Sequence, residues 1–352
     1  MASRVVGLDI GTSSVRAAEL SLSKGTATLE RFGQVALPLG AVRDGEVQDV
    51  EAVAGCIRQL WAQAKFSTKR VVVGVANQKV VVRQIDLPWL PENELRKSLS
   101  FQVQDYVPMP VDETILDFHQ LEEFHNESGA RMSRVLLVAA SRDMVGSAVD
   151  AVNRAGLQPS MVDLTSFAVL RSLASLDELA LQGAEALVDV GAQVTNIVVH
   201  YGGVPRFVRI LLMGGGDITD ALAERLGVPT EQAEAIKQES GMATVPTGME
   251  ATPAGRAIET TASALVEEIR GSLDYYMAQP GAEPIARVVL SGGGSRLGGL
   301  AERLAAATRL PVTAARPLST MKLGKTGLTD DQLAYVEPLV TVPVGLAMGV
   351  SA

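Results

Sequence analysis

The chain has 352 residues, of which 47% are hydrophobic and 20% are charged, a composition that can build the cores of two or three domains. The net charge of −9 and a pI near 5.0 argue against nucleic acid or an anionic membrane as the main direct partner. The single cysteine, Cys56, excludes an intrachain disulfide, and the three histidines (His119, His125 and His200) show no metal-ligand spacing.

The N-terminal segment is typical of a buried strand and not of a targeting signal. It has no signal-peptide core or cleavage site, and no stretch approaches the ~18 apolar residues of a membrane span, so we expect a soluble, cytoplasmic protein.

The apolar run Val5–Leu8 ends in Asp9-Ile10-Gly11-Thr12. Gly11 allows close approach of a ligand, and the amides and hydroxyls around Thr12, Ser13 and Ser14 can donate to phosphate oxygens. An ordinary β-turn would also explain Asp-x-Gly.

The same pattern returns 180 positions later. Asp189-Val190-Gly191-Ala192 follows the apolar run Ala186–Val188 and leads into a β-rich run, Val194–Tyr201, as Asp9 leads into Val15–Leu20. This repeat predicts two similar α/β halves that face each other across a cleft. Asp9 and Asp189 would then bind Mg²⁺ jointly with phosphate groups, the mode that this cation prefers.

A small α/β unit is predicted between the two copies. Val80–Pro88 is typical of a strand, and a helix is expected over Pro91–Tyr106. Its apolar stripe is Leu95, Leu99, Val103 and Tyr106. Two strands (114–121 and 134–141) and a helix over 142–155, closed by Gly156, are expected next.

Three further patterns in the second half suggest a nucleotide. Gly214, Gly215 and Gly216 precede a helix with Asp217 as N-cap, which predicts an anion site or a flexible connector. Glu234 and Lys237 share one face of a helix, as a surface ion pair or as contacts to ribose or adenine. The strand Val288–Leu290 runs into Gly292, Gly293, Gly294 and Ser295 and then a helix from Leu297, which predicts either a base pocket or a tight turn.

The order of these patterns resembles the superfamily of actin, heat-shock chaperone and hexokinase ATPases, and the "EAIK" helix is similar to FtsA. The runs "ELRKSLSFQVQDYVPMPVDETILDF" and "AGLQPSMVDLTSFAVLRSL" resemble the PilM family of type IV pilus assembly proteins. The resemblance implies an actin-like (ribonuclease H-like) α/β fold of two domains with an interdomain nucleotide cleft and an inserted FtsA-type subdomain. The implied boundaries are domain I at 1–84, 163–188 and about 320–352, the insert at 85–162, and domain II at 189–319 with a helical subdomain at about 217–285.

The resemblance also implies ligands and a partner. ATP or ADP with Mg²⁺ would occupy the cleft, and the cytoplasmic tail of a PilN-type membrane protein would bring the chain to the inner face of the cytoplasmic membrane. We expect this tail in a groove between the Pro91–Tyr106 helix and the first subdomain. The implied nucleotide-binding residues are Asp9, Gly11, Thr12, Ser13, Ser14, Arg16, Asp189, Gly191, Gly214, Gly215, Gly216, Glu234, Lys237, Gly292, Gly293, Gly294 and Ser295, with Asp9 and Asp189 at the metal through water.

Two departures from the family pattern bear on activity. Arg16 stands where family members often carry lysine; it shares strand parity with Ser14 and faces either phosphate or solvent. Chaperone-like ATPases place a glutamate near the helix after Asp163, whereas this chain has Leu164-Thr165-Ser166, and Thr165 is a poor general base. We therefore expect weak hydrolysis or none.

Three alternatives fit less well. An FtsA-like division scaffold would be expected to add a basic amphipathic membrane helix after the fold. A small-molecule kinase needs a catalytic aspartate, for which there is no convincing candidate. A type II secretion homologue would normally carry a membrane span.

Overall fold

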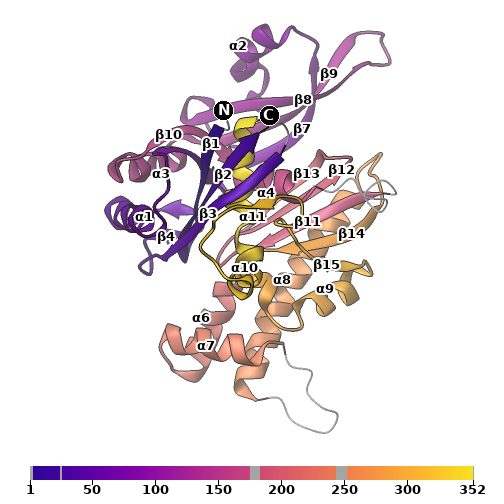
Figure 1. Cartoon of the computed structure of the whole chain (residues 1–352). Coiled ribbons are helices and arrows are strands. Elements are labelled where there is room, and N and C mark those ends of the chain that lie inside the picture. The colour runs from indigo at the N-terminus through magenta and orange to yellow at the C-terminus, as the bar shows by residue number, and fades with distance from the viewer. Residues whose placement is uncertain (1–2, 24–25, 175–182, 243–251, 352) are drawn as a thin grey trace.

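The computed structural model describes residues 3–23, 26–174, 183–242 and 252–351. Within these ranges the chain forms a six-stranded sheet, a five-stranded sheet and a three-stranded sheet that stands out at one end of the molecule (Figure 1). A short hairpin of β4 (Val42–Arg43) and β5 (Glu46–Val47) lies beside the first of these. The two α/β halves predicted from the repeat are confirmed.

The first large sheet has the strand order β10-β6-β1-β2-β3-β16. Strands β1, β2 and β3 form an antiparallel meander, whereas β6 and β10 extend the sheet in parallel with β1. The bounds are β1 Ser3–Ile10, β2 Ser14–Ser23, β3 Thr26–Ala36, β6 Arg70–Val75, β10 Gln158–Leu164 and β16 Lys322–Leu323. Because successive side chains alternate between faces, Leu8 packs in the core under α1 (Val50–Ala64) and Val5 in the core under α11 (Thr341–Met348).

The second large sheet follows the same plan, in the order β13-β12-β11-β14-β15. Its strands are β11 Ala184–Val190, β12 Thr195–Tyr201, β13 Val204–Leu211, β14 Ile285–Ser291 and β15 Val312–Ala314. One face is covered by a helical layer of α6 Gly215–Leu226, α7 Thr230–Ser240, α8 Pro253–Met277 and α9 Leu300–Thr308. The other face shares a core with α11 and with α4 (Thr165–Leu173), so these two helices lie between the large sheets (Figure 1).

The three-stranded sheet has the order β7-β9-β8 and forms a small unit with α2. Its elements are β7 Val80–Pro88, α2 Glu92–Gln102, β8 Thr114–His125 and β9 Arg131–Ser141, with 3₁₀ turns at Gln104–Tyr106 and Val111–Glu113. Leu95, Leu99 and Val103 are buried against the sheet as predicted. The helix ends four residues earlier than expected, and Tyr106 lies in the following turn with 38% of its surface exposed, so it is not part of the apolar stripe.

The surroundings of this unit differ from the expectation. Helix α3 (Arg142–Arg154) packs on α1, and β10 pairs with β6, so both lie with the first large sheet although we expected them in the insert. Helix α2 packs on β8 at the far end of the unit (Figure 1), and the expected groove between α2 and the first large sheet stays a prediction. Strand β7 instead contacts β13, so the unit touches both halves.

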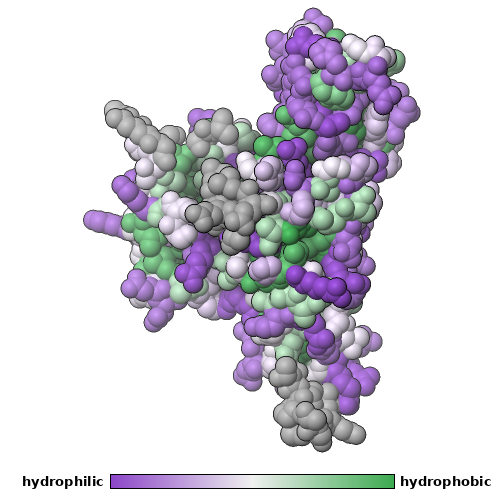
Figure 2. Space-filling view, turned by 90° about the vertical axis from the view of Figure 1, so that its right-hand side faces the viewer, coloured by the Kyte–Doolittle hydropathy of each residue, from purple (hydrophilic) through white to green (hydrophobic). Residues whose placement is uncertain are grey.

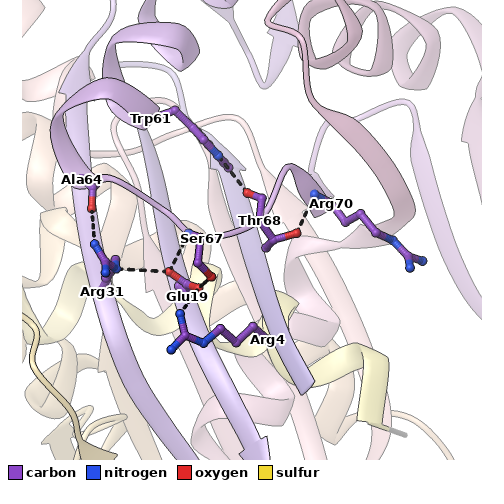
Figure 3. A network of polar contacts seen from close by, with 8 residues as sticks. All are labelled: Arg4, Glu19, Arg31, Trp61, Ala64, Ser67, Thr68 and Arg70. Atoms are coloured by element: carbon purple, nitrogen blue, oxygen red, sulfur yellow. Dashed lines mark hydrogen bonds and ion pairs between the residues drawn. The ribbon is translucent and has the colours of Figure 1, made fainter. Parts of the chain in front are cut away.

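A buried carboxylate ties the first sheet to the loop that follows α1. Glu19 of β2 is fully buried and receives Arg31 at 3.4 Å, Arg4 at 3.7 Å and the amide of Ser67 at 3.2 Å (Figure 3). Each partner comes from a different segment: β1, β3 and the loop before β6. Removing one of these donors would leave the buried charge of Glu19 poorly compensated, which is strongly destabilising.

The remaining elements complete the C-terminal part of the first half. They are α10 Asp330–Val336 and the 3₁₀ turns Glu337–Leu339 and Gly349–Ser351. In the described parts of the chain, no helix combines the length and the apolarity that a membrane crossing requires.

Candidate functional site

The first turn of the repeat closes on a backbone hydrogen bond beside a buried aspartate. The amide of Gly11 donates to the carbonyl of Ser14 at 3.0 Å, which reverses the chain between β1 and β2. Asp9 is only 8% exposed and lies directly opposite Arg16 across the strand pair. The Nε atom of Arg16 is 3.7 Å from Oδ2 of Asp9 and donates to Oγ of Ser14 at 3.2 Å. Arg16 therefore faces the cleft and not solvent.

The second turn repeats this geometry with one chemical difference. The amide of Gly191 donates to the carbonyl of Val194 at 2.9 Å, and Asp189 is 7% exposed. The residue opposite Asp189 is the neutral Asn196. Its Oδ1 accepts a hydrogen bond from Oγ of Ser166 at 2.9 Å, which links the second turn to α4.

Both turns line one narrow cleft between the large sheets, with a cavity volume of about 50 Å³. Seven of the predicted residues line it: Asp9, Gly11, Thr12, Arg16, Asp189, Gly191 and Gly292. Gly292 has a φ of 82°, and a Cβ atom there would lie 2.4 Å from the carbonyl oxygen of Val190, so only glycine fits this approach.

The predicted glycines before α6 are beside the second turn, but their amides already have acceptors. The amides of Gly215 and Gly216 donate to the carbonyls of Gly191 and Ala192, at 2.9 and 2.6 Å. The amide of Gly214 donates to Asp217, which is the third residue of the helix and not its N-cap. The anion site expected at these three amides is therefore not formed, and the glycines act instead as a close backbone contact.

Glu234 and Lys237 form the predicted ion pair, at 2.7 Å, and this pair is anchored to the start of α6. Nζ of Lys237 donates to the carbonyl of Gly215 at 2.8 Å and to Oγ1 of Thr219 at 2.9 Å. Thr219 also donates to Glu234 at 2.5 Å. The pair therefore lies next to the glycines and is not an isolated surface pair.

The remaining predicted residues lie around the end of β11, except for the two serines of the first turn. Gly294 would place a Cβ 2.4 Å from a methyl group of Val190, and Ser295 donates its hydroxyl to the carbonyl of Gly292 at 2.7 Å. Gly292 is followed by a 3₁₀ turn over Gly293–Arg296, and the helix begins at Leu300, three residues later than expected. Ser13 is exposed, and Ser14 reaches the cleft only through its contact with Arg16.

The sequence interpretation missed several residues that line the cleft. They include Gly45, Gly74, Ala76 and Asn196. Asn196 is 180 positions after Arg16, so the repeat itself could have revealed it. Gly45 lies at the tip of the β4–β5 hairpin, where the amide of Asp44 donates to Oε1 of Gln193 at 3.2 Å and so bridges the two halves. No local pattern indicates that contact.

Burial sets the electrostatics of the two carboxylates. It raises the pKa of Asp9 above its ordinary value, and the positive charge of Arg16 opposes that rise. Burial also raises the pKa of Asp189 to about 6; Arg16 again opposes the rise, and the negative charge of Asp9 adds to it. Arg16 thus acts on both carboxylates, and the charge of Asp9 acts on Asp189. An added cation would stabilise the ionised form of both.

These residues fit a magnesium ion that is bound together with a ligand. Among the described residues there is no cluster of three or more His, Cys, Asp or Glu side chains that could hold a metal alone. Mg²⁺ commonly uses one or two carboxylates plus substrate phosphates and keeps several waters, and the pair Asp9 and Asp189 matches that donor set.

The comparison with known families places this fold. The model of the family described as "Type IV pilus assembly protein PilM" matches residues 7–350. The chain belongs to the PilM family. The solved structure titled "PilM-PilN type IV pilus biogenesis complex" is similar with a TM-score of 0.85 and 27% identity, over 98% of each chain.

Two further proteins are similar to this PilM-family chain. The cell division protein FtsA of Escherichia coli K12 is 27% identical over 97% of this chain and 89% of its own length. The structure of MreB5 of Spiroplasma citri bound to ADP is similar with a TM-score of 0.52 and 11% identity, over 99% of this chain and 98% of that one. The expected actin-like fold, in its FtsA/PilM branch, is confirmed.

Proposed function

We propose that this PilM-family chain binds ATP or ADP, together with Mg²⁺, in the cleft between the two large sheets. The observation that carries the proposal is the pair of turns, in which a buried aspartate and a glycine occupy matched positions on both sides of one cleft. Asp9 and Asp189 would hold the Mg²⁺ ion through water molecules, and the ion would screen the phosphate charges. Gly11 and Thr12 would contact phosphates, and Glu234 and Lys237 would lie nearest adenosine.

Nucleotide entry requires the cleft to widen. Ligand pockets usually measure ~300–1,000 Å³, whereas this cleft encloses about 50 Å³. The halves are joined across it by the hydrogen bond from Asp44 to Gln193. We therefore expect that binding separates the β4–β5 hairpin from the second turn.

Titration with the fluorescent analogues mant-ATP and mant-ADP in the presence of Mg²⁺ tests this proposal. Saturable binding that unlabelled ATP or ADP reverses is expected. The matched control is Asp86→Ala, which removes an aspartate of β7 that pairs with Arg134 outside the cleft. Absence of saturable binding by the folded wild-type chain would contradict the proposal.

The proposal includes a partner. The similarity to the PilM–PilN complex supports docking of a PilN-type cytoplasmic tail, which would hold the chain at the inner face of the cytoplasmic membrane as a component of the pilus assembly platform. The three-stranded unit (residues 80–141) stands apart as a largely hydrophilic lobe, with hydrophobic residues gathered where it meets the body (Figure 2). We place the docking site on this unit and its border. A tail that orders on binding would give moderate affinity.

Photo-crosslinking tests the partner. A synthetic PilN N-terminal peptide with a benzoylphenylalanine is irradiated with the full chain, and crosslinked residues are identified by mass spectrometry. Crosslinks within residues 80–141 or their neighbours are expected, with a scrambled peptide as control. Crosslinks confined to α6–α9 would exclude the unit as the docking site. The similarity to FtsA keeps a division scaffold as the alternative function, and an absence of binding to any PilN-type tail would favour it.

A further inference from the structure

The end of the first large sheet that lies away from the cleft carries a group of positive side chains. Strand β1 runs toward the cleft, and Arg4 lies five residues, or about 16 Å, before Asp9. Positive residues of β3, of the loop after α1 and of the start of β6 lie at the same end of the sheet. We define the basic end as Arg4, Arg31, Lys65, Lys69 and Arg70.

The sequence around the basic end has no carboxylates. Residues 52–85 contain six lysines and arginines and no aspartate or glutamate, in a chain whose net charge is −9. Lys65, Lys69 and Arg70 are exposed, and in the described parts of the chain none of the three forms an ion pair. The side chain of Arg70 points away from the Glu19 network (Figure 3). These three charges are therefore available to a partner.

The buried Glu19 positions the two remaining residues of the basic end (Figure 3). Its carboxylate lies 3.7 Å from Arg4 and 3.4 Å from Arg31, and it also accepts from the hydroxyl and the amide of Ser67. The side chains of Arg4 and Arg31 stay 49% and 38% exposed. Because one negative charge faces two positive charges here, the network presents a net positive charge at the surface.

The arrangement of the basic end favours a broad anionic surface over an extended acidic segment. Strands β6, β1 and β2 are interior strands of the sheet, so they offer no free edge to which a peptide strand could be added. The positive residues extend from β6 to β3, across three strand spacings or about 14 Å. Clusters of four or more lysines and arginines next to a membrane bind anionic lipid headgroups. Salt screens the negative charges of the rest of the chain beyond about 8 Å.

We propose that the basic end is a contact surface for the anionic headgroups of a lipid bilayer. The contact adds to a protein partner and orients the chain; the part that concerns orientation rests on the proposed function. Strand β1 begins toward the end of the molecule from which the three-stranded unit protrudes (Figure 1). A tail docked on that unit and the headgroups would thus hold the same end of the chain, and the cleft would face away from the bilayer.

Sedimentation with sucrose-loaded vesicles tests this surface on the full chain alone, without nucleotide or peptide. The vesicles are pure phosphatidylcholine or contain about 30% phosphatidylglycerol. At about 50 mM NaCl we expect binding to the anionic vesicles only. At about 300 mM NaCl we expect this binding to weaken by about tenfold, because salt shortens the range of the attraction. Equal binding to both kinds of vesicle, or none to the anionic vesicles, would overturn the proposal.

A pair of double variants separates the basic end from net charge. Lys69→Gln/Arg70→Gln should bind the anionic vesicles about tenfold or more weakly than the wild type, since each charge near the surface accounts for about fivefold. The matched control is Arg309→Gln/Arg316→Gln, which removes two exposed charges beside β15 of the second sheet. The control should bind within about twofold of the wild type. An equal loss in both double variants would overturn the proposal.

An acidic peptide is the competing partner. Polyglutamate that binds the wild type but not Lys69→Gln/Arg70→Gln, while anionic vesicles bind neither chain, would overturn the proposal in favour of an acidic protein segment. The crosslinking experiment described above tests the PilN-type tail independently. A chain that binds anionic vesicles through the basic end but binds no such tail would retain this surface and lose the proposed partner.

Discussion

The turn after β1 and the turn after β11 share a backbone but differ in charge. Each closes on a glycine amide that donates to the third residue ahead, at 3.0 and 2.9 Å, and each places a buried aspartate beside it. Across the strand pair, the first aspartate faces Arg16 and the second faces Asn196. The comparison shows that the turn geometry occurs on both walls of the cleft. A positively charged side chain, by contrast, lies opposite the aspartate on one wall only.

The largest effect is expected when either aspartate is removed. Asp9→Ala and Asp189→Ala should each weaken binding of mant-ATP with Mg²⁺ by about 1–3 kcal/mol, because both contribute to the same metal through water. Titration of both variants beside Asp86→Ala measures this. If neither variant changes the affinity, the turns are not phosphate sites.

Substitution of the glycine in each turn by alanine should destabilise the folded chain to a different extent. A Cβ atom on Gly191 would lie 2.6 Å from the carbonyl oxygen of Val194, so Gly191→Ala should cost about 1–3 kcal/mol. On Gly11 the nearest atoms are 3.1 Å away, and one of them belongs to the side chain of Arg16, so Gly11→Ala should cost about 1 kcal/mol or less.

Urea denaturation of both glycine variants compares these costs. Gly146→Ala in α3 is the control, since nothing lies within 4 Å of its added Cβ and a helical glycine is itself unfavourable. The comparison is wrong if Gly11→Ala proves as costly as Gly191→Ala.

Ionisation of Asp189 should destabilise the folded chain at pH values above the pKa of this carboxyl. The pKa of this carboxyl is about 6 in the folded chain against an ordinary 3.8, so the folded state favours the protonated form. Its stabilising contribution is present below about pH 4 and is lost as the pH rises through 6. Asp189→Asn should therefore stabilise the nucleotide-free chain at pH 8 by about 1–3 kcal/mol.

Melting curves of wild type and Asp189→Asn between pH 4 and pH 8 check this. The gain should shrink as the pH falls through 6. Asp86→Asn, which changes an aspartate paired with Arg134 outside the cleft, is the matched control. A gain that stays constant across this range would contradict an origin in the ionised carboxylate.

The smallest effect concerns hydrolysis. Thr165 lines the cleft, and its hydroxyl is a poor general base. Asp163 is engaged, because its Oδ1 accepts from the amide of Leu164 at 2.8 Å and its Oδ2 pairs with Arg171. Phosphate release by the chain alone should therefore stay well below the ~10 s⁻¹ typical of enzymes. A rate at or above that value would refute this expectation.

Local patterns were sufficient to predict much of the fold. The strand Val80–Pro88 has the predicted bounds, and the repeat of Asp9 at Asp189 predicted both halves. These features depend on hydrophobic periodicity and on turn residues, which are local properties of the sequence. The nucleotide itself stays a prediction.

Contacts between distant segments could not be read in the same way. The amides of Gly215 and Gly216 look free in the sequence, but the second turn lies against them and accepts both hydrogen bonds. The direction of Arg16 was open because strand parity fixes a face and not what covers it. Helix α3 looked like part of the insert because the chain reaches it from β9, whereas its apolar residues pack on α1.

The two large sheets differ in how the chain supplies them. The described strands of the second sheet all lie between residues 184 and 314, whereas the first sheet needs β10 from residue 158 and β16 from residue 322, and its buried face is closed by α11 at residues 341–348. During synthesis the N-terminal part of a chain usually folds first. Five strands of the first sheet precede the whole second sheet in the chain, but β16 and α11, which complete the first half, come after every described strand of the second sheet. The long loop closures of the first sheet make its completion the slower event.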